Sequence, residues 1–464
     1  MNKKLLLRST LASVLTIAGM ALGATAQAAV SAADAAKLGA ELTPLGAEKA
    51  GNADGSIPAW DGGLTSASQA GFANFRPGQH HPDPYANDKP LYTITAANMS
   101  QYGNKLTEGH KKLLQTYRNS FKMIVYPTHR SGASPQRIYD ATKRIATTAE
   151  LAAGGNGVVK AGEGVPFPIP KSGVEVFWNH VLRYRGDVIV RNIGQAPVTA
   201  SGSYTMVKFR DETMVAYSLA GAKSENLNNT IAYFIQETVA PARLAGEVLL
   251  VQETLDQSVE NRRAWVYNAG QRRVRRAPDL NYDNINDGTE GMRTTDQFDA
   301  YNGAPDRYDW KLVGKQEVYI PYNSYKLSDK KLKYKDNIIR KNTINPDVMR
   351  YELHRCWVIE ANLKGGSKHI YGKRVFYLDE DSWTVVYEDA YDTRKQLWRV
   401  SMHPMIQFYD AKVPWYRANI WHDLSNGSYL LSLLENEIKT PWKFGEKGKW
   451  ADFQPDALRR AGTK

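Results

Sequence analysis

The sequence RRAWVYNAGQRRVRRAP, Arg262–Pro278, decides the fold class of this chain. Its two arms, Arg262–Tyr267 and Arg272–Arg276, flank the turn Asn-Ala-Gly at residues 268–270, which predicts a β-hairpin. Segments that alternate at period two come before and after this hairpin along the chain. Because short turns join many of them, they predict one large antiparallel sheet, strongly curved or closed, rather than a parallel α/β fold.

The predicted strands lie on both sides of the hairpin. Those before it span Arg183–Asn192, Ser203–Arg210, Thr213–Leu219, Ile231–Thr238 and Gly246–Thr254. Those after it span Trp310–Tyr319, Glu352–Asn362, His369–Leu378, Thr384–Ala390 and Gln396–Met402. The segment Asp423–Ile438 fits either a last strand or a helix. The strand series therefore fills most of the second two thirds of the chain.

The N-terminal third has a different pattern, with helical spacing and Pro-rich extended stretches. It predicts helices at Ser31–Leu42, Asn98–Tyr117 and Pro135–Leu151, and a linker at Gly162–Gly173. These helices are available to cover one face of the sheet, which makes the fold class α+β. The expected organisation is a leader at residues 1–28, a helical and extended N-terminal region at 29–161, an antiparallel β domain at 162–440 and a tail at 441–464.

The first 28 residues have the pattern of a cleavable secretory signal peptide. Positive charges at Lys3, Lys4 and Arg8 precede the uncharged apolar stretch Leu11–Gly23, and the following ATAQA has small residues at the cleavage-determining positions. The apolar stretch is too short to span a bilayer. The expected compartment is the bacterial periplasm, and cleavage lowers the net charge from +12 to +9.

Composition narrows the class of protein. The 464 residues are 42% hydrophobic and 23% charged, which excludes general disorder, and a single cysteine excludes a disulfide scaffold. Cys356 is expected to be a packed core residue of a strand. Nucleotide-binding loops are missing, so no cofactor is expected. In the periplasm the basic surplus points away from nucleic acid and toward anionic lipid head groups, with peripheral membrane contact as one form of it.

Motifs for metal binding and catalysis are weak. His80 and His81, with Asp83, form the only adjacent His pair, but they lie on a Pro-rich loop that is expected to be solvated. The run Asp283–Gly288 resembles a calcium loop, yet Ile285 stands where an oxygen ligand is required. No nucleophile elbow G-x-S-x-G is present. We therefore expect neither a metal nor a catalytic residue, and we expect the protein not to be an enzyme.

The Arg-rich hairpin is the strongest candidate for a binding site. Arg273 and Arg275 share one face of the second arm, while Arg272, Val274 and Arg276 share the other. One interpretation is a solvated hairpin whose charges protect a sheet edge. The other is a site where guanidinium groups bind an anionic head group.

Long motifs resemble a known family. The run WVYNAGQRRVRRAPDLNYD, the following GMRTTDQFDAYNGAPDRYDWKLVGKQEVYIPYNSYKL, the N-terminal LTPLGAEKAGNADGSIPAWDGGL and the C-terminal FQPDALRR are similar to the bacterial domain of unknown function 1329 family. That family is similar in fold to the lipoprotein carrier LolA and its receptor LolB. The resemblance implies an unclosed antiparallel barrel, covered by helices, with an apolar cavity for acyl chains. It also implies a partner among membrane transporters of the resistance-nodulation-division class.

The resemblance implies a function but transfers no catalytic residue. We expect a soluble periplasmic carrier of a lipid, lipoprotein or other hydrophobic ligand, which serves trafficking in the envelope. The residues expected to bind the ligand are Trp265, Tyr267, Arg272, Arg273, Arg275, Arg276 and Trp310. The loop Asp296–Trp310 could equally be a structural clasp across the sheet. Two alternatives remain: a carbohydrate binder that uses exposed Trp and Tyr, and an envelope hydrolase with converging carboxylates or a Ser/His pair.

Overall fold

The computed structural model describes residues 30–278, 280–285 and 288–462. The predicted signal peptide, residues 1–28, lies outside this range. A sheet of 16 strands dominates the fold, in the order β1-β2-β12-β13-β14-β15-β18-β19-β5-β6-β7-β8-β9-β10, with β11 on β12 and β20 on β5. The edge strand β10 pairs only with β9, and β11 only with β12, so the sheet is not closed. The predicted large, unclosed and mainly antiparallel sheet is confirmed.

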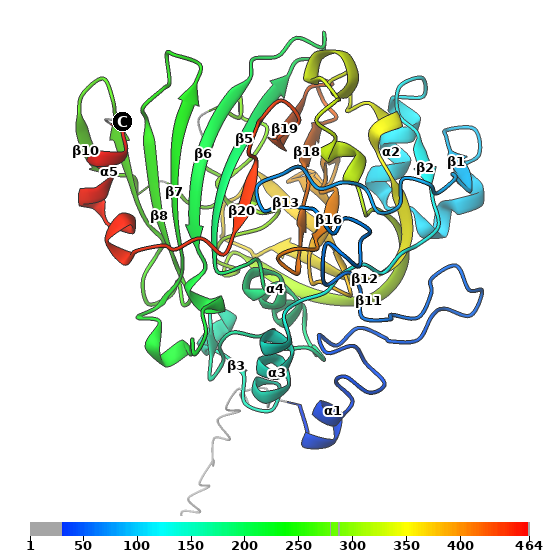
Figure 1. Ribbon diagram of the computed structural model, residues 1–464, viewed down its shortest axis with the longest axis horizontal. Helices are drawn as coiled ribbons and strands as arrows, with labels where there is room; N and C mark the ends of the chain where they lie inside the picture. Colours follow the sequence, from blue (N-terminus) through cyan, green and yellow to red (C-terminus); the bar gives the residue numbers. More distant parts are fainter. Residues whose placement is uncertain (1–29, 279, 286–287, 463–464) are drawn as a thin grey trace, which may run out of the picture.

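The strands form two groups that meet where β19 pairs with β5. The first group forms the curved wall on the left of Figure 1 and comprises β5 (Val188–Val198), β6 (Val207–Met214), β7 (Thr230–Ala240), β8 (Val248–Thr254), β9 (Arg263–Asn268) and β10 (Arg273–Arg276). The second comprises β11 (Tyr308–Pro321), β12 (Tyr351–Leu363), β13 (Tyr371–Asp379), β14 (Val385–Asp392), β15 (Leu397–Met402), β18 (Asn419–Asp423) and β19 (Tyr429–Leu434). The single parallel pair joins β2 to β12.

Shorter elements complete the fold. The remaining strands are β1 (Tyr92–Ile94), β2 (Met123–Val125), β3 (Glu150–Leu151), β4 (Val158–Val159), β16 (Met405–Phe408), β17 (Val413–Tyr416) and β20 (Trp442–Phe444). The α-helices are α1 (Ala32–Ala36), α2 (Glu108–Thr116), α3 (Gln136–Ile145), α4 (Gly173–Leu182) and α5 (Pro455–Ala461). Short 3-10 turns lie at η1 (Met99–Lys105), η2 (Ala153–Gly155), η3 (Ala216–Ser218), η4 (Ser224–Asn226), η5 (Thr295–Gln297), η6 (Tyr325–Ser328), η8 (Pro346–Val348) and η9 (Trp450–Phe453), with one π-helical turn, η7 (Tyr334–Ile338).

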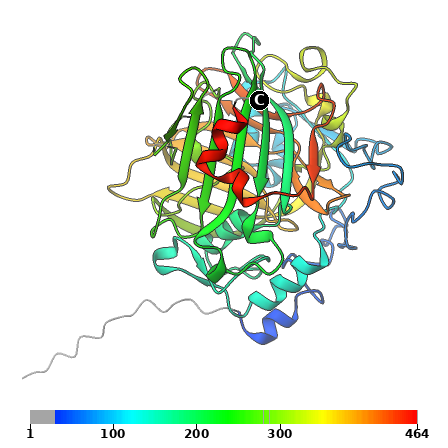
Figure 2. The same cartoon turned by 60° about the vertical axis from the view of Figure 1, so that its left-hand side comes forward.

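Alternation along the strands assigns each side chain to one face of the wall. In the hairpin, Val266 lies opposite Arg275, and Tyr267 lies opposite Val274, so each cross-strand pair shares a face. Tyr267 and Val274 face outward, where η9 and α5 cover them with Phe453. Figure 2 shows this C-terminal segment lying across the outer face of the wall. Its last turns thus bury an apolar surface that the hairpin would otherwise expose.

Helix α4 was not predicted from the sequence. Its residues, Gly173–Leu182, lie between the expected linker, Gly162–Gly173, and the expected strand that began at Arg183, and no element was expected for them beyond Gly173. Every residue of α4 except Val174 is buried, and the helix packs against β11 and β12. A helix that is buried on nearly all sides has no exposed polar face, and its sequence therefore lacks the amphipathic period that marks a surface helix. Ser172 caps it by accepting a hydrogen bond from the Glu175 amide at 3.3 Å.

Three other sequence predictions were wrong in their boundaries. The helix expected at Asn98–Tyr117 is two elements, η1 and α2, because Thr107 adopts an extended backbone and caps α2. The two strands expected at Ser203–Arg210 and Thr213–Leu219 are one strand, β6. Asp211, in the expected gap between them, lies within β6, where its buried carboxylate accepts a 2.6 Å bond from Arg191. Similarly, α1 and α3 are shorter than expected.

Cys356 is fully buried in β12, as predicted. Burial raises the pKa of its thiol well above the usual value. Among the described helices, none is long and apolar enough to cross a membrane.

Asp389 provides a test of how burial affects stability. Its carboxylate in β14 accepts a 3.0 Å hydrogen bond from the Gly109 amide at the start of α2, and burial raises its pKa to about 7. Because the folded-state pKa exceeds the unfolded value of 3.8, the folded protein holds the proton more tightly, and stability falls as pH rises from about 4 to 7. Asp389→Asn should remove this loss.

The measurement is urea unfolding of both proteins at pH 5 and at pH 8. Between pH 5 and pH 8, wild type should lose about 2–3 kcal/mol more unfolding free energy than Asp389→Asn loses. The exposed Asp140→Asn on α3 is the control and should follow the wild-type pH dependence. Equal pH dependence of Asp389→Asn and wild type would contradict the assignment.

Candidate functional site

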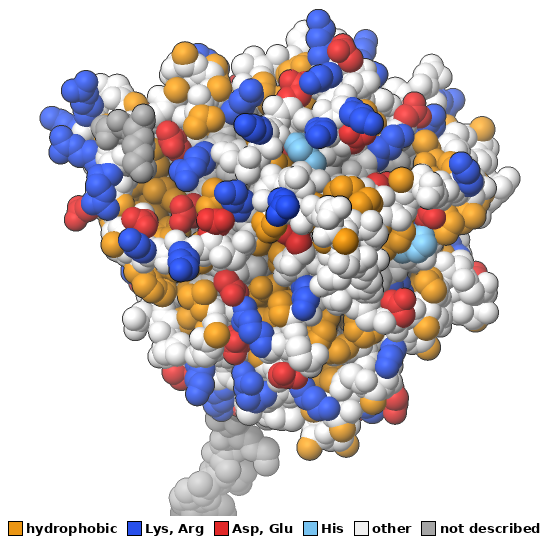
Figure 3. Space-filling model, in the orientation of Figure 1, with side chains coloured by type: hydrophobic (Ala, Val, Ile, Leu, Met, Phe, Trp, Pro, Cys, Tyr) orange, Lys and Arg blue, Asp and Glu red, His pale blue; other side chains and the backbone are white. Residues whose placement is uncertain are grey.

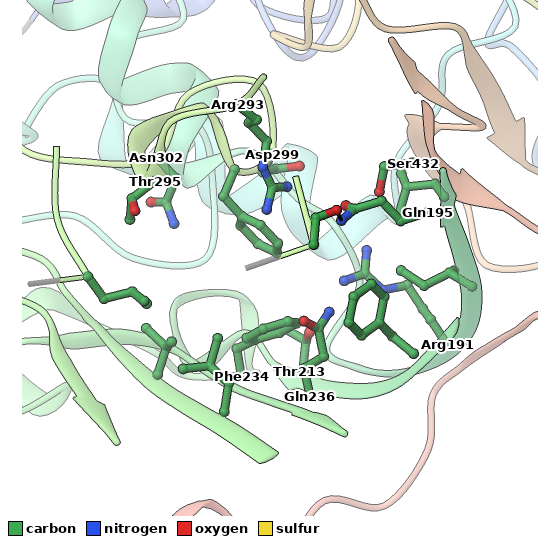
Figure 4. A pocket seen from close by; sticks show the side chains of 18 of the residues that line it. Arg191, Gln195, Thr213, Phe234, Gln236, Arg293, Thr295, Asp299, Asn302 and Ser432 are labelled. Carbon is green, nitrogen blue, oxygen red and sulfur yellow. Dashed lines mark hydrogen bonds between the residues drawn. The ribbon is translucent and has the colours of Figure 1, made fainter. Parts of the chain in front are cut away.

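A cavity lies against the inner face of the wall formed by β5 to β9. It has a volume of about 240 Å³ and is partly open to solvent. Strand β6 contributes Val207, Phe209 and Thr213, and β7 contributes Phe234 and Gln236. Alternation explains this set, because every second residue of each strand points to the same face. Figure 4 shows Thr213, Phe234 and Gln236 pointing into the cavity from the strands below it.

Most of the cavity wall is apolar. Besides the residues named above, the lining includes Ile193, Val215, Ile231, Ala232, Leu249, Val251, Val266 and Leu433. Polar side chains also line it, among them Thr213, Gln236, Thr238 and Glu253. Arg191 donates to Asp211 at 2.6 Å, and Gln195 donates to the Gly288 carbonyl at 2.8 Å. Since polar groups that fix orientation inside an apolar pocket are typical of small-molecule sites, this cavity is the candidate binding site.

The loop between β10 and β11 forms the roof of the cavity. It contributes Leu280, Arg293, Thr295, Phe298 and Asn302 to the lining. Residues 296–310 were considered as a structural clasp across the sheet. The contacts of Asp296, the first of these residues, fit this alternative, because they hold the loop to the second group of strands. Asp296 accepts bonds from Arg374 in β13 at 2.8 Å and from His369 at 3.1 Å. Burial opposes ionisation of Asp296, but the Arg374 guanidinium holds the pKa of its carboxyl below the usual value.

A second charged cluster, centred on Asp299, lies beside Arg293 in the lining of the cavity (Figure 4). Asp299 accepts two 3.0 Å bonds from Arg183, a further bond from Arg185 and a 2.8 Å bond from the Trp415 indole. Burial raises the pKa of Asp299, and the two guanidinium groups outweigh that effect and lower it. Burial lowers the pKa of Arg185. One carboxylate therefore serves two buried cations.

Arg293 of the roof loop has surroundings that differ from those of Arg183 and Arg185. Its side chain is 9% exposed, lines the cavity and lies over the rings of Phe298 at 5.6 Å and Trp421 at 5.4 Å. Its Nε atom is buried without a hydrogen-bond partner in the part of the chain that the structure describes. Burial lowers the pKa of Arg293 to about 10, so the side chain remains a cation at neutral pH.

The residues predicted to bind the ligand lie outside this cavity. Trp265 and Tyr267 face the C-terminal cover on the outer side of the wall, and Arg276 stacks over Trp265 at 5.3 Å. Arg273 and Arg275 share the inner face with Val266 but are exposed at the sheet edge, while Arg272 lies in the turn. Figure 3 shows basic side chains gathered at this edge, near β10 and α5.

Trp310 lies apart from the hairpin. It packs against Phe177 of α4 at 4.8 Å and against Phe376 at 5.8 Å, and its indole donates to the Pro305 carbonyl at 2.9 Å. These rings line a separate void of about 10 Å³, close to the space of one water molecule. The hairpin residues and Trp310 are therefore not brought together, and a ligand role for them stays a prediction.

One group of side chains has the composition of a metal site. His354, Asp379 and Asp381 place one ligand atom each within 4.8 Å of one another. However, Asp381 already accepts bonds from Arg130 at 2.7 and 2.9 Å, and Glu352 accepts a bond from His354 at 3.1 Å. These contacts are those of an internal ion-pair network.

The His pair of the N-terminal region is not the solvated loop that was expected. His81 is buried and contacts Asp410 at 2.8 Å, whereas His80 contacts the Ile438 carbonyl at 2.8 Å. The two rings bind separate partners, which tie the extended N-terminal chain to the sheet. The calcium-like run lies partly outside the described residues.

Comparison with known proteins follows this geometry. Residues 93–459 match the family described as "Protein of unknown function (DUF1329)". The uncharacterized protein PA3922 of Pseudomonas aeruginosa is 51% identical over 443 residues, which cover 96% of each chain.

Solved structures show weaker similarity. A putative outer membrane lipoprotein-sorting protein domain from Vibrio parahaemolyticus has 12% identity and a TM-score of 0.44, and the alignment covers 62% of this chain and 98% of that one. A DUF1329 family protein from Desulfovibrio piger has 16% identity and a TM-score of 0.38, with 59% and 92% covered. The LolA superfamily protein NE2245 from Nitrosomonas europaea has 11% identity and a TM-score of 0.37, with 62% and 99% covered. With most of its length matched by the family and a close relative over nearly all of it, the chain belongs to the DUF1329 family, as the hairpin and its flanking motifs indicated.

Proposed function

We propose that this protein binds and carries a single-chain amphiphile in the bacterial periplasm. The observation that carries the proposal is the apolar cavity between β5–β9 and the roof loop. An apolar cavity of about 150 Å³ holds benzene, so about 240 Å³ accommodates about ten non-hydrogen atoms. That is one alkyl chain, and the open side of the cavity lets a longer chain or a polar head extend outward.

The proposal favours binding over catalysis. The cavity combines apolar contacts along β6 and β7 with charged groups elsewhere in its lining, among them Arg293 and Asp299 of the roof, and an amphiphile requires both kinds of contact. We propose that the Arg273 and Arg275 side chains, exposed at the sheet edge on the inner face, add contact with anionic head groups of the membrane.

A role in envelope trafficking completes the proposal. The N-terminal leader pattern supports export, and the family resemblance supports delivery to or from a transporter of the resistance-nodulation-division class. Cross-linking in intact cells followed by purification of this protein tests the partner. Recovery of a transporter of another class, or of no membrane protein, would count against this part of the proposal.

The binding function is tested on the purified mature protein. Solvent extraction followed by mass spectrometry should recover an amphiphile, and the emptied protein should take up a fluorescent fatty acid. Absence of both would overturn the proposal. Binding in a glycan array without uptake of amphiphile would favour the carbohydrate alternative.

A larger side chain at position 213, in the wall of the cavity, would fill part of its volume. The Thr213 hydroxyl is buried without a hydrogen-bond partner among the described residues, and the side chain lines the cavity. Thr213→Phe should weaken fatty-acid uptake about tenfold or more, because the added ring occupies a large share of the alkyl-chain volume.

The matched control is Thr213→Val, which keeps the volume and removes the hydroxyl. It should bind the fluorescent acid as tightly as wild type or more tightly. Unchanged binding in Thr213→Phe, with its thermal unfolding midpoint near that of wild type, would show that the ligand lies elsewhere.

A further inference from the structure

We infer that the amphiphile carries an oxyanion head group and that Arg293 binds it inside the cavity. The inference rests on the proposed binding function and specifies the chemistry of the ligand. Figure 4 shows Arg293 reaching down from the roof, on the opposite side of the cavity from Phe234 and Thr213.

The charge balance of the cavity wall singles out Arg293. Other arginines of the lining have acidic partners: Arg191 pairs with Asp211 at 2.6 Å, and Arg262 pairs with Glu253 at 2.7 Å. For Arg293 the described residues supply no ion pair and no hydrogen bond, and only the faces of two aromatic rings lie against it. A cation that is 91% buried and unpaired in this way is unfavourable unless something else neutralises it.

The neighbouring cluster adds to the imbalance. Arg183 and Arg185 share the single carboxylate of Asp299, and Arg185 also lines the cavity. Its Nε atom, like that of Arg293, is buried without a hydrogen-bond partner among the described residues. Among the described lining residues around the roof, two cations, Arg185 and Arg293, therefore accompany one carboxylate, Asp299.

A carboxylate at one end of an alkyl chain matches this arrangement. Guanidinium groups bind carboxylates through two parallel hydrogen bonds, and the low polarity around Arg293 strengthens them. The chain would lie along the apolar side chains of β6 and β7, such as Phe209 and Phe234. A phosphate monoester shares the same oxyanion chemistry, so the experiment includes both.

The experiment compares three ligands of equal chain length by calorimetry: dodecanoate, dodecyl phosphate and the neutral dodecanol. Wild-type protein should bind at least one of the two anions about 10- to 100-fold more tightly than the alcohol, the range expected for hydrogen bonds to a charged group. The ratio of dodecanoate to dodecyl phosphate affinity then identifies the head group.

Arg293→Met should abolish that preference. The two anions should lose about 10- to 100-fold in affinity, while dodecanol should bind as before. Arg293→Lys keeps the charge but loses the paired hydrogen bonds, so it should retain an intermediate preference. Without ligand, Arg293→Met should unfold at the same temperature as wild type or at a higher one, since an unpaired buried charge has been removed.

The outcomes separate the two proposals. If dodecanol binds wild type as tightly as both anions do and Arg293→Met changes none of the three affinities, the head-group inference fails while the carrier function stands. If none of the three ligands binds, the carrier function itself fails. A lower unfolding temperature of Arg293→Met together with an unchanged anion preference would show that Arg293 only supports its aromatic neighbours.

Discussion

Asp296→Ala is expected to destabilise the protein by about 3–5 kcal/mol, because it removes one of the two carboxylates that pair with the buried Arg374 guanidinium. Asp296 is 1% exposed and binds Arg374 at 2.8 Å, His369 at 3.1 Å and the Thr294 hydroxyl at 2.6 Å. Removing the carboxylate would leave Arg374 with only Glu388, at 2.5 Å. The cost of burying the guanidinium would then exceed the attraction that remains.

The same substitution should loosen the cavity. Asp296 lies in η5, between the roof residues Arg293 and Phe298, and its partners lie on the second group of strands. Once that tie is lost, the roof no longer has a fixed position over β6 and β7. We therefore expect uptake of the fluorescent fatty acid to fall with stability, even at temperatures where Asp296→Ala remains folded.

Urea unfolding followed by tryptophan fluorescence measures the loss. Arg394→Ala is the control, because it breaks an ion pair of similar length, 3.1 Å to Asp392, whose arginine side chain is 79% exposed. That variant should lose no more than about 1 kcal/mol. Equal unfolding free energies for the two variants would contradict the role given to burial.

The sequence was sufficient to predict the β-hairpin and most strands of the sheet. Alternation and turn residues mark β7 to β10 and β11 to β15 locally, so these strands lie within a few residues of the expected bounds. Helix α4 could not be found in this way, because it is buried on nearly all sides and its sequence lacks the amphipathic period that marks a surface helix. Likewise, the expected break between Arg210 and Thr213 is wrong, because an ion pair between Asp211 and Arg191 stabilises a buried charge in the middle of β6.

The cavity could not be predicted because no local pattern identifies its face. In β9 both faces are apolar: Ala264 and Val266 point inward, whereas Trp265 and Tyr267 point outward. The larger aromatic side chains suggested a ligand site, but the C-terminal segment, nearly 200 residues later, covers them. Periodicity pairs residues on a face, and only the tertiary structure decides which face is hollow.

Arg293 left no signal in the sequence at all. It stands in the polar run GMRTTDQF, where an arginine is expected to be solvated. Its significance comes from what surrounds it after folding: Trp421 from β18 and the apolar strands below the roof. In the same way, Arg183 and Asp299 are 116 residues apart, and their pairing depends on α4 bringing Arg183 to the roof.

Arg130→Ala is the second substitution with a large expected effect. It should lower the free energy of unfolding by about 3–5 kcal/mol. The Arg130 guanidinium forms two bonds to Asp381, at 2.7 and 2.9 Å. It also donates to the carbonyls of Glu48 at 2.7 Å and Pro58 at 3.3 Å. One side chain therefore ties the extended N-terminal segment to the turn between β13 and β14.

Loss of Arg130 should have a local effect as well as a global one. Asp381 would remain buried beside Glu380 without its principal cation. Residues 48–58 would keep the bonds from Arg355 to the carbonyls of Glu48, at 3.0 Å, and Ala50, at 2.7 Å, and a few contacts with Lys315, Glu317 and Glu380. We expect this segment to detach before the sheet unfolds, because its remaining ties are fewer than those within the strands.

Limited proteolysis separates the two effects. Arg130→Ala should be cleaved within residues 48–58 at urea concentrations that leave the tryptophan fluorescence of the sheet unchanged, whereas wild type should resist cleavage there. The exposed Arg118→Ala, which loses one 3.2 Å bond to the Gln115 carbonyl, should behave as wild type. Arg130→Lys keeps the charge but cannot bond Asp381 and the carbonyls together, so it should lie between the two. Cleavage at equal rates in all four proteins would show that the N-terminal segment is held by its apolar contacts instead, since Ile57 is also buried in the main core.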